Sequence, residues 1–301
     1  MRSQRPAPDL HSGSLEIKGV RRTFWLARPA ESGAPLLVVL HGLGMDGPDM
    51  DRLTGLARRG PAAGFATVFP DAWGQRWDGA QRDPARHTVD DPEFISDLVA
   101  HLTDAGVARS GPVVVVGLSN GALFAEFLAR HAVLELALLA LVSGTANEQS
   151  RQQCPRPRQS TAVVCIAGTA DRVMPYVGGV IGGSGLIGRL TRRRSHGHRL
   201  ERPVAMAVET LAGEWAAANG DVSSPTIDPV PGQSRRLPVT LLSWARDPLQ
   251  PVRVYRIDGG GHGWPGGPQY LPAMAVGRVS RDLDATGIIL ALAQGLVAQS
   301  A

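Results

Sequence analysis

Ser119, Asp171 and His262 are residues of the types that supply a nucleophile, an acid and a base in covalent catalysis. Ser119 lies in the turn "GLSNG", directly after the four valines 113–116 and before a helix-compatible apolar pattern. A strand, a tight glycine turn and a helix are the context of a nucleophile elbow, which exposes the serine hydroxyl at the carboxyl end of a strand. The alternative is a small serine on an ordinary turn between a strand and a helix.

A serine nucleophile needs a histidine to take its proton and a carboxylate to orient that histidine. In one arrangement on parallel sheets, the acid and then the histidine follow the serine along the chain, each on a loop after a strand. Asp171 follows the apolar run 162–168, and His262 follows the run that ends near Asp258. Of the eight histidines, only His262 follows a late strand. Asp258 is the competing acid, although we expect it on the strand that leads to His262.

The third requirement is a pair of N–H donors for the oxyanion that forms on the attacked carbonyl. The loop "LHGLG", residues 40–44, consists largely of small residues and ends the first long apolar run. We expect the backbone N–H groups of Leu43 and of Asn120, the residue after the serine, to be these donors. The glycines also suit a simple tight turn, and the two interpretations are compatible.

Apolar runs of strand length alternate with segments of helical periodicity. Several runs are continuously hydrophobic, which is typical of parallel strands covered on both faces; the runs span residues 36–42, 65–72, 113–117, 136–144, 162–168 and 252–262. Helices are expected over 90–106 and 203–220, and an antiparallel hairpin over 14–29. The pattern predicts an α/β fold with a mostly parallel central sheet and helices on both faces. We expect one domain over residues 1–301, with residues 1 to about 14 as an N-terminal tail.

The composition is that of a globular protein, with 301 residues, 43% hydrophobic residues, 19% charged residues and a formal net charge of +4. No apolar run approaches the roughly 18 residues of a membrane-spanning helix. The densest basic stretch, residues 188–202, has no interleaved aromatic residues and matches no nucleic-acid-binding motif. We therefore expect a solvated loop or a partner-binding surface there and no nucleic-acid partner, and the oligomeric state stays open.

The two cysteines, Cys154 and Cys165, are too few for a disulfide framework or a zinc site. A bond between them stays open, although Cys165 lies in an apolar run and suits a buried small hydrophobe. The N-terminus lacks the hydrophobic segment of a signal peptide. We expect a cytoplasmic protein if Met1 is the native start, or a secreted one if an export signal has been removed.

Five motifs together resemble an esterase family that includes polyhydroxybutyrate depolymerases and feruloyl and acetyl-xylan esterases: "LHGLG", "GLSNGA", "GTADRVMPY", "ETLAGEWAAANG" and "GGGHGWPGG". The resemblance covers about residues 15–270, and its last motif is the most specific. It implies a catalytic α/β-hydrolase domain with Ser119, Asp171 and His262 as the triad, acting on carboxylic esters without a metal or an organic cofactor. Family members are commonly exported, and many carry a cysteine where this chain has Leu43, a change that leaves the backbone N–H donor in place.

The expected activity is that of a serine esterase that hydrolyses short-chain, hydroxyalkanoate-type, feruloyl or acetyl esters through an acyl-enzyme. The substrate is a small molecule or a polymeric ester. An acyltransferase with the same triad, a polyester depolymerase and a binding module without catalysis are the alternatives. Trp77, Tyr176 and Trp264 are candidates for the substrate pocket, and simple packing explains the tryptophans equally well.

Overall fold

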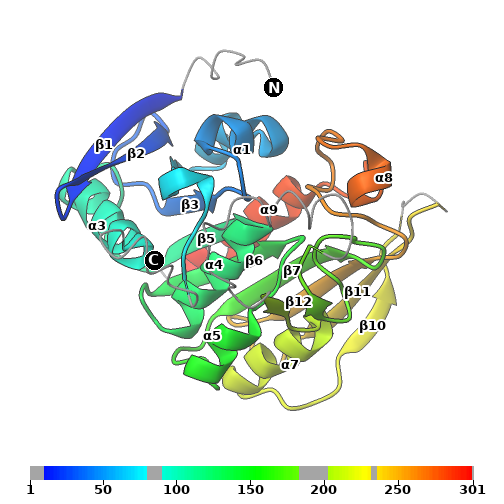
Figure 1. Cartoon of the computed structure of the whole chain (residues 1–301). Coiled ribbons are helices and arrows are strands. Elements are labelled where there is room, and N and C mark those ends of the chain that lie inside the picture. The colour runs from blue at the N-terminus through cyan, green and yellow to red at the C-terminus, as the bar shows by residue number, and fades with distance from the viewer. Residues whose placement is uncertain (1–9, 80–89, 183–202, 232–235, 300–301) are drawn as a thin grey trace.

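The apolar runs of the sequence become the inner strands of a ten-stranded sheet (Figure 1). The computed structural model describes residues 10–79, 90–182, 203–231 and 236–299, and the basic stretch 188–202 lies outside these ranges. Across the sheet, the strands are β1 (His11–Ile17), β2 (Val20–Ala27), β4 (Ala66–Pro70), β3 (Leu36–Leu40), β5 (Val113–Leu118), β6 (Leu136–Val142), β7 (Ala162–Gly168), β12 (Val252–Ile257), β11 (Val239–Trp244) and β10 (Thr226–Pro229).

The six strands from β4 to β12 in this order pair in parallel, and the strands at the two margins pair antiparallel. A separate two-stranded sheet consists of β8 (Gly179–Val180) and β9 (Val204–Ala205). The helices of the described residues are α1 (Gly47–Thr54), α2 (Leu56–Ala62), α3 (Asp91–Asp104), α4 (Asn120–Arg130), α5 (Glu148–Gln153), α7 (Val208–Ala218), α8 (Ala273–Val276) and α9 (Ala285–Gln299), with a 3-10 turn at Trp73–Gln75. The mostly parallel sheet predicted from the sequence is confirmed.

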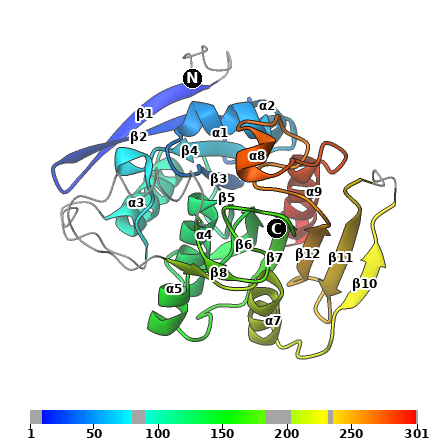
Figure 2. The same cartoon turned by 45° about the vertical axis from the view of Figure 1, so that its right-hand side comes forward.

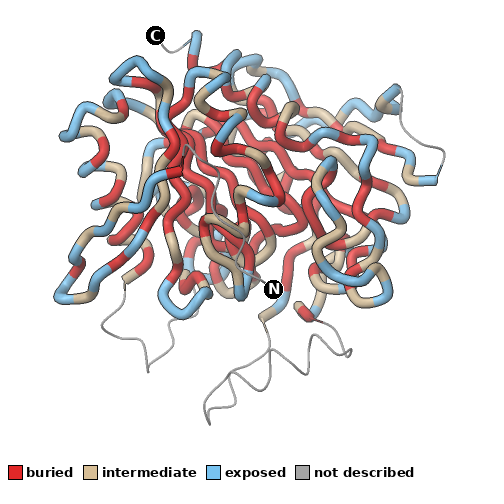
Figure 3. The backbone as a smooth tube through the Cα atoms, turned by 90° about the horizontal axis from the view of Figure 1, so that it is seen from above, coloured by how far each residue is buried: buried red, intermediate tan, exposed pale blue. Residues whose placement is uncertain are grey.

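Burial on both faces of the sheet explains why β5 is hydrophobic at every position. Val113 and Val115 pack into the core on one face of the sheet, and Val114 and Val116 pack into the core on the other. Residues of α3, α4 and α7 complete the first core, and residues of α1, α2 and α9 complete the second (Figure 2). Figure 3 shows the resulting buried strands at the centre of the molecule, with exposed segments around them. A strand covered on both faces has no polar side, so alternation is absent.

The N-terminal hairpin begins earlier than the sequence predicted. Strand β1 starts at His11, so residues 11–14 are part of the sheet and the predicted tail of about 14 residues is too long. His11 pairs with Leu26, and Gly13 lies opposite Phe24. The side chain of Phe24 fills the space above Gly13, because a Cβ built there would lie 2.3 Å from its ring. This cross-strand packing is a contact that the polar N-terminal residues do not reveal.

The two predicted helices are present, and one of them is shorter than expected. Helix α3 begins after Asp90, whose side chain accepts a hydrogen bond from the Glu93 N–H as an N-cap. Helix α7 ends before Asn219, and Gly220 follows with a φ of 81°. The segment before Val208 is extended instead of helical, because β9 pairs there with β8.

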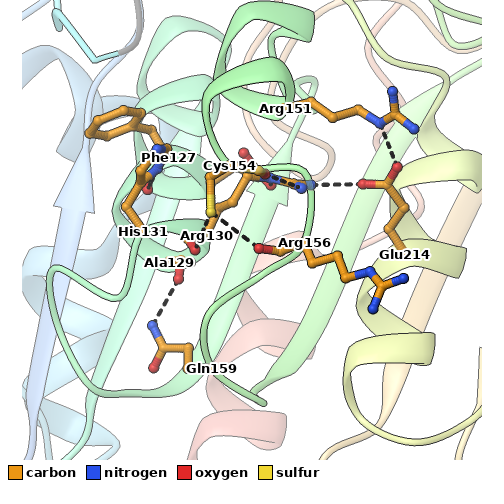
Figure 4. Close-up of polar contacts among 10 residues, drawn as sticks. Phe127, Ala129, Arg130, His131, Arg151, Cys154, Arg156, Gln159 and Glu214 are labelled. Atoms are coloured by element: carbon orange, nitrogen blue, oxygen red, sulfur yellow. Dashed lines mark hydrogen bonds and ion pairs between the residues drawn. The ribbon is translucent and has the colours of Figure 1, made fainter.

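A partly buried ionic network holds α4 against α5 and α7 (Figure 4). The Arg130 guanidinium donates to Glu126 at 2.6 Å and to Glu214 at 3.0 Å, and Arg151 donates to the other oxygen of Glu214 at 2.6 Å. Arg130 also donates to the carbonyl oxygen of Cys154 at 3.2 Å. Since α4 starts at the turn that carries Ser119, this network fixes the helix behind that turn.

Cys154 and Cys165 are both buried and free, so they are not bonded to each other.

Candidate functional site

The candidate site lies at the carboxyl end of the parallel strands, where loops from neighbouring strands meet. Ser119 follows β5, Asp171 lies three residues after β7, and His262 lies five residues after β12. The strands β5, β6, β7 and β12 are consecutive across the sheet. Because the strands are parallel, all these loops emerge at the same edge, which is where ligands bind in open α/β sheets.

Ser119 has the backbone conformation of a sharp strand-to-helix turn. Its φ is 55° and its ψ is −115°, which places a non-glycine residue in a rarely populated region. Its N–H donates to the carbonyl oxygen of Val142 at 3.0 Å, so the turn stays attached to β6. Gly121 allows the helix to start this close to the sheet, since a Cβ there would lie 2.3 Å from the Leu40 carbonyl oxygen. The Ser119 residue is half-buried, and the contacts just described hold the chain on both sides of it.

Asp171 and His262 form a buried hydrogen-bonded pair. The His262 Nδ1 lies 2.7 Å from Asp171 Oδ2, and the histidine is 2% exposed. A carboxylate only accepts hydrogen bonds, so the Nδ1 carries the proton of this bond. The other oxygen of Asp171 accepts the N–H groups of Val173 and Met174, each at 2.8 Å. These two bonds orient the carboxylate within its loop.

The competing acid, Asp258, lies elsewhere. It follows the last residue of β12, and its side chain is 43% exposed. Its carboxylate forms an ion pair with the Arg256 guanidinium at 3.3 Å. Within the described part of the chain, the carboxylate that meets His262 is therefore that of Asp171.

The serine and the histidine lie on two sides of the residues that follow β6. A Cβ at Gly144 would lie 3.0 Å from the carbonyl oxygen of Ser119, while the hydroxyl of Ser143 bonds to Gly263, next to His262. No hydrogen bond joins Ser119 Oγ to His262 among the described residues. Such bonds are commonly long without a substrate and shorten in the complex with substrate. The role of Ser119 as nucleophile stays a prediction.

The loop after β3 approaches Ser119 as the sequence analysis expected. A Cβ at Gly42 would lie 3.7 Å from the Cβ of Ser119. The Gly44 N–H donates to the carbonyl oxygen of Gln75 at 2.8 Å, which anchors the loop. In the described structure, the N–H of Leu43 donates to no acceptor. Asn120 is the first residue of α4, and N–H groups in the first helical turn have no acceptor within the helix. Both donors are therefore available for a ligand oxygen, and their role stays a prediction.

His41 supports this loop, a role that the sequence analysis did not assign. The ring is fully buried; its Nε2 accepts the Ala72 N–H at 3.0 Å, so Nδ1 carries the proton and donates to the Gly42 carbonyl oxygen at 2.8 Å. Burial lowers the pKa of His41 and favours this neutral form. In the sequence, this role is indicated only by the position of His41 at a strand end, in a loop that contains two glycines.

The three candidate pocket residues lie in the interior. Trp264 donates its indole N–H to Thr286 at 2.9 Å, and the Tyr176 hydroxyl donates to Glu209 at 2.8 Å. Burial and the neighbouring Glu209 raise the pKa of Tyr176. Trp77 is 2% exposed and stacks on Phe124 with ring centroids 5.0 Å apart. These contacts favour packing in this conformation, and contact with substrate stays a prediction for all three.

Trp77 links the loop after β3 to the turn that carries Ser119. Its indole N–H donates to the His41 carbonyl oxygen at 3.0 Å, and its backbone N–H donates to the Asn120 side chain at 2.8 Å. We expect Trp77→Phe to lower the free energy of unfolding by about 1–3 kcal/mol, because a buried carbonyl loses its donor. KM for an ester substrate should stay within about twofold if the ring only packs. Denaturant unfolding and steady-state kinetics check this, and a large rise in KM at normal stability would instead assign Trp77 to the pocket.

Among the described residues, no group of three or more His, Cys, Asp or Glu side chains is arranged to hold a metal ion. No helix in the described ranges is long and apolar enough to cross a membrane.

Comparison with known proteins gives a relative and a structural neighbour. The chain is 28% identical over 294 residues to "Putative esterase NocK" of Nocardia uniformis subsp. tsuyamanensis, covering 93% of this chain and 82% of that protein. The acetyl xylan esterase from Aspergillus awamori superposes with a TM-score of 0.57 at 14% identity, covering 84% of this chain and 94% of the other. No protein-family model matches the chain. The sheet order, the flanking helices and this superposition show an α/β-hydrolase fold.

Proposed function

We propose that this protein is a serine esterase that hydrolyses carboxylic esters through an acyl-enzyme. The observation that carries the proposal is the buried bond of 2.7 Å between His262 and Asp171, on the same sheet edge as the strained turn of Ser119. A histidine held in one tautomer by a carboxylate is the base that a serine nucleophile needs. The names of the Nocardia relative and of the Aspergillus neighbour, both esterases, support the same class of reaction.

In the proposed reaction, Ser119 Oγ attacks the ester carbonyl carbon while His262 Nε2 takes the hydroxyl proton. The N–H groups of Leu43 and Asn120 stabilise the negative oxygen of the tetrahedral intermediate. The bond to the alcohol oxygen then breaks, and His262 returns the proton to the leaving alcohol. Asp171 stays bonded to Nδ1 throughout and stabilises the imidazolium.

The second half of the reaction uses water. His262 takes a proton from a water molecule, which attacks the acyl carbonyl, and the proton returns to Ser119 as the acid leaves. Every step uses a side chain or a backbone N–H, so the proposal includes no metal or organic cofactor. An acceptor alcohol in place of water would give acyl transfer, which is the alternative reaction of the same acyl-enzyme.

The sequence motifs resemble those of polyhydroxybutyrate depolymerases and feruloyl and acetyl-xylan esterases, and the superposed neighbour is an acetyl xylan esterase. We therefore propose short-chain acyl, hydroxyalkanoate, feruloyl or acetyl esters as substrates, in small molecules or in polymers.

A hydrolysis panel tests the proposed function. We expect turnover of at least one member of a set that contains short-chain nitrophenyl esters, methyl ferulate, acetylated xylan and hydroxybutyrate oligomers. Adding an alcohol acceptor and measuring both free acid and new ester separates hydrolysis from acyl transfer. No turnover on any of these esters would contradict the proposal and favour a binding module without catalysis.

A further inference from the structure

Ser143 is buried between the two halves of the candidate site. It directly follows β6, which lies between β5, the strand of the elbow, and β7, the strand of the acid. Its N–H donates to the Ile166 carbonyl oxygen of β7 at 2.9 Å, so the residue continues the ladder of the sheet. Its φ is 46°, a left-handed conformation that is uncommon for residues other than glycine.

The hydroxyl of Ser143 binds the loop of His262 at two points. It donates to the carbonyl oxygen of Gly263 at 2.7 Å and accepts the N–H of the same residue at 3.0 Å. A hydroxyl is one of the few side-chain groups that can donate and accept at once. The side chain is 2% exposed, so water does not compete for these bonds. Both sides of His262 are then held, because its own N–H donates to the Val276 carbonyl oxygen at 2.6 Å.

The neighbouring Gly144 touches the elbow instead. A Cβ at this position would lie 2.4 Å from the Cβ of Ala122, on the first turn of α4, and 3.0 Å from the Ser119 carbonyl oxygen. The backbone of residue 144 therefore packs directly on the turn that carries the nucleophile. Ser143 and Gly144 together form a two-residue spacer that contacts both Ser119 and the His262 loop.

We propose that Ser143 is a positioning residue whose hydroxyl sets the separation between the proposed nucleophile and the proposed base. This inference rests on the proposed function, since a spacing between Ser119 and His262 matters only if they react together. Ser143 does not touch the reacting atoms and exchanges no proton with them. It acts by holding the backbone beside His262 at a constant distance from the elbow. The strained φ of this residue agrees with a functional constraint on its place.

Two substitutions separate the hydroxyl from the backbone. Ser143→Ala and Ser143→Gly both remove the bonds to Gly263, while glycine also removes the strain of the positive φ. We expect kcat to fall about 100-fold in both variants, because a shift of about 1 Å in a catalytic group costs about that factor. KM should stay within about twofold, since no substrate contact is lost. The rate at which a fluorophosphonate modifies Ser119 should fall with kcat.

Ser150→Ala is the matched control. Ser150 is also a buried serine, it lies on α5, and its hydroxyl has no hydrogen-bond partner among the described residues. We expect wild-type kcat and KM from this variant. Thermal unfolding of all variants establishes that each one is folded under the conditions of the assay.

Several results would overturn the positioning role. Wild-type kcat in Ser143→Gly would show that the hydroxyl is not required, and any loss in Ser143→Ala would then come from the backbone conformation. A rise in KM alone would assign Ser143 to substrate binding. Failure of both variants to fold would make the residue purely structural. These results differ from failure of the proposed function itself, in which the wild-type protein hydrolyses no ester and the fluorophosphonate leaves Ser119 unmodified.

Discussion

Replacement of Ser119 by alanine is expected to abolish ester hydrolysis and to leave the protein folded. The side chain is half-buried at a turn and makes no hydrogen bond among the described residues, so its removal costs little packing. Without a nucleophile no acyl-enzyme forms, and only a residual acceleration of about 10³–10⁴ over water from binding and the oxyanion donors should remain. Steady-state hydrolysis of a short-chain nitrophenyl ester, with the melting temperature of each protein, measures both effects.

A distant serine provides the control for this substitution. Ser160 lies before β7, at the opposite end of the parallel strands, and donates to the Ala218 carbonyl oxygen from an exposed position. Ser160→Ala should retain full activity. A fluorophosphonate should form a phosphorus–oxygen bond with Ser119 as fluoride leaves, and mass spectrometry of the labelled peptide identifies the residue. Near-normal turnover in folded Ser119→Ala would exclude it as the nucleophile.

Asp171→Asn is expected to lower kcat by about 10⁴-fold, with little change in KM. One oxygen of Asp171 accepts two backbone N–H groups, and the other faces His262 Nδ1. An asparagine has a single oxygen, and the two backbone donors hold it on their side. Its NH₂ group would then face the imidazole and require a lone pair on Nδ1. The proton would move to Nε2, the atom that must act as the base.

Asp258→Asn is the matched comparison, because it makes the same chemical change four residues before His262. Its carboxylate is exposed and paired with Arg256, so the substitution removes a surface ion pair. Such pairs contribute about 0–1 kcal/mol to stability, and most of the activity should remain. Kinetics on both variants at the same pH decides between them. A severe loss in Asp258→Asn together with an active Asp171→Asn would make Asp258 the acid.

The sequence by itself determined the elements that carry the site. Continuous apolar runs predicted the parallel strands, and the structure confirms them, because burial on both faces leaves a signal in each strand alone. The same local signals placed Ser119 on a strand-to-helix turn and Asp171 and His262 on loops after strands. Elements with weaker patterns were not predicted. Strand β11 is only partly buried, and α9 contains no charged residue, so neither shows the contrast that reveals an element.

Only the tertiary structure decided which side chains meet. The sequence left Asp258 as a competitor to Asp171 for the role of the acid. Asp171 reaches His262 because β7 and β12 are neighbours in the sheet, although 83 residues separate them in the chain. The bond between Ser143 and Gly263 joins residues 120 positions apart and has no local signature. The burial of Trp77 likewise depends on a stack formed with α4. Contacts of this kind follow from sheet order and loop packing, which are properties of the whole chain, whereas hydrophobic periodicity is a property of each segment.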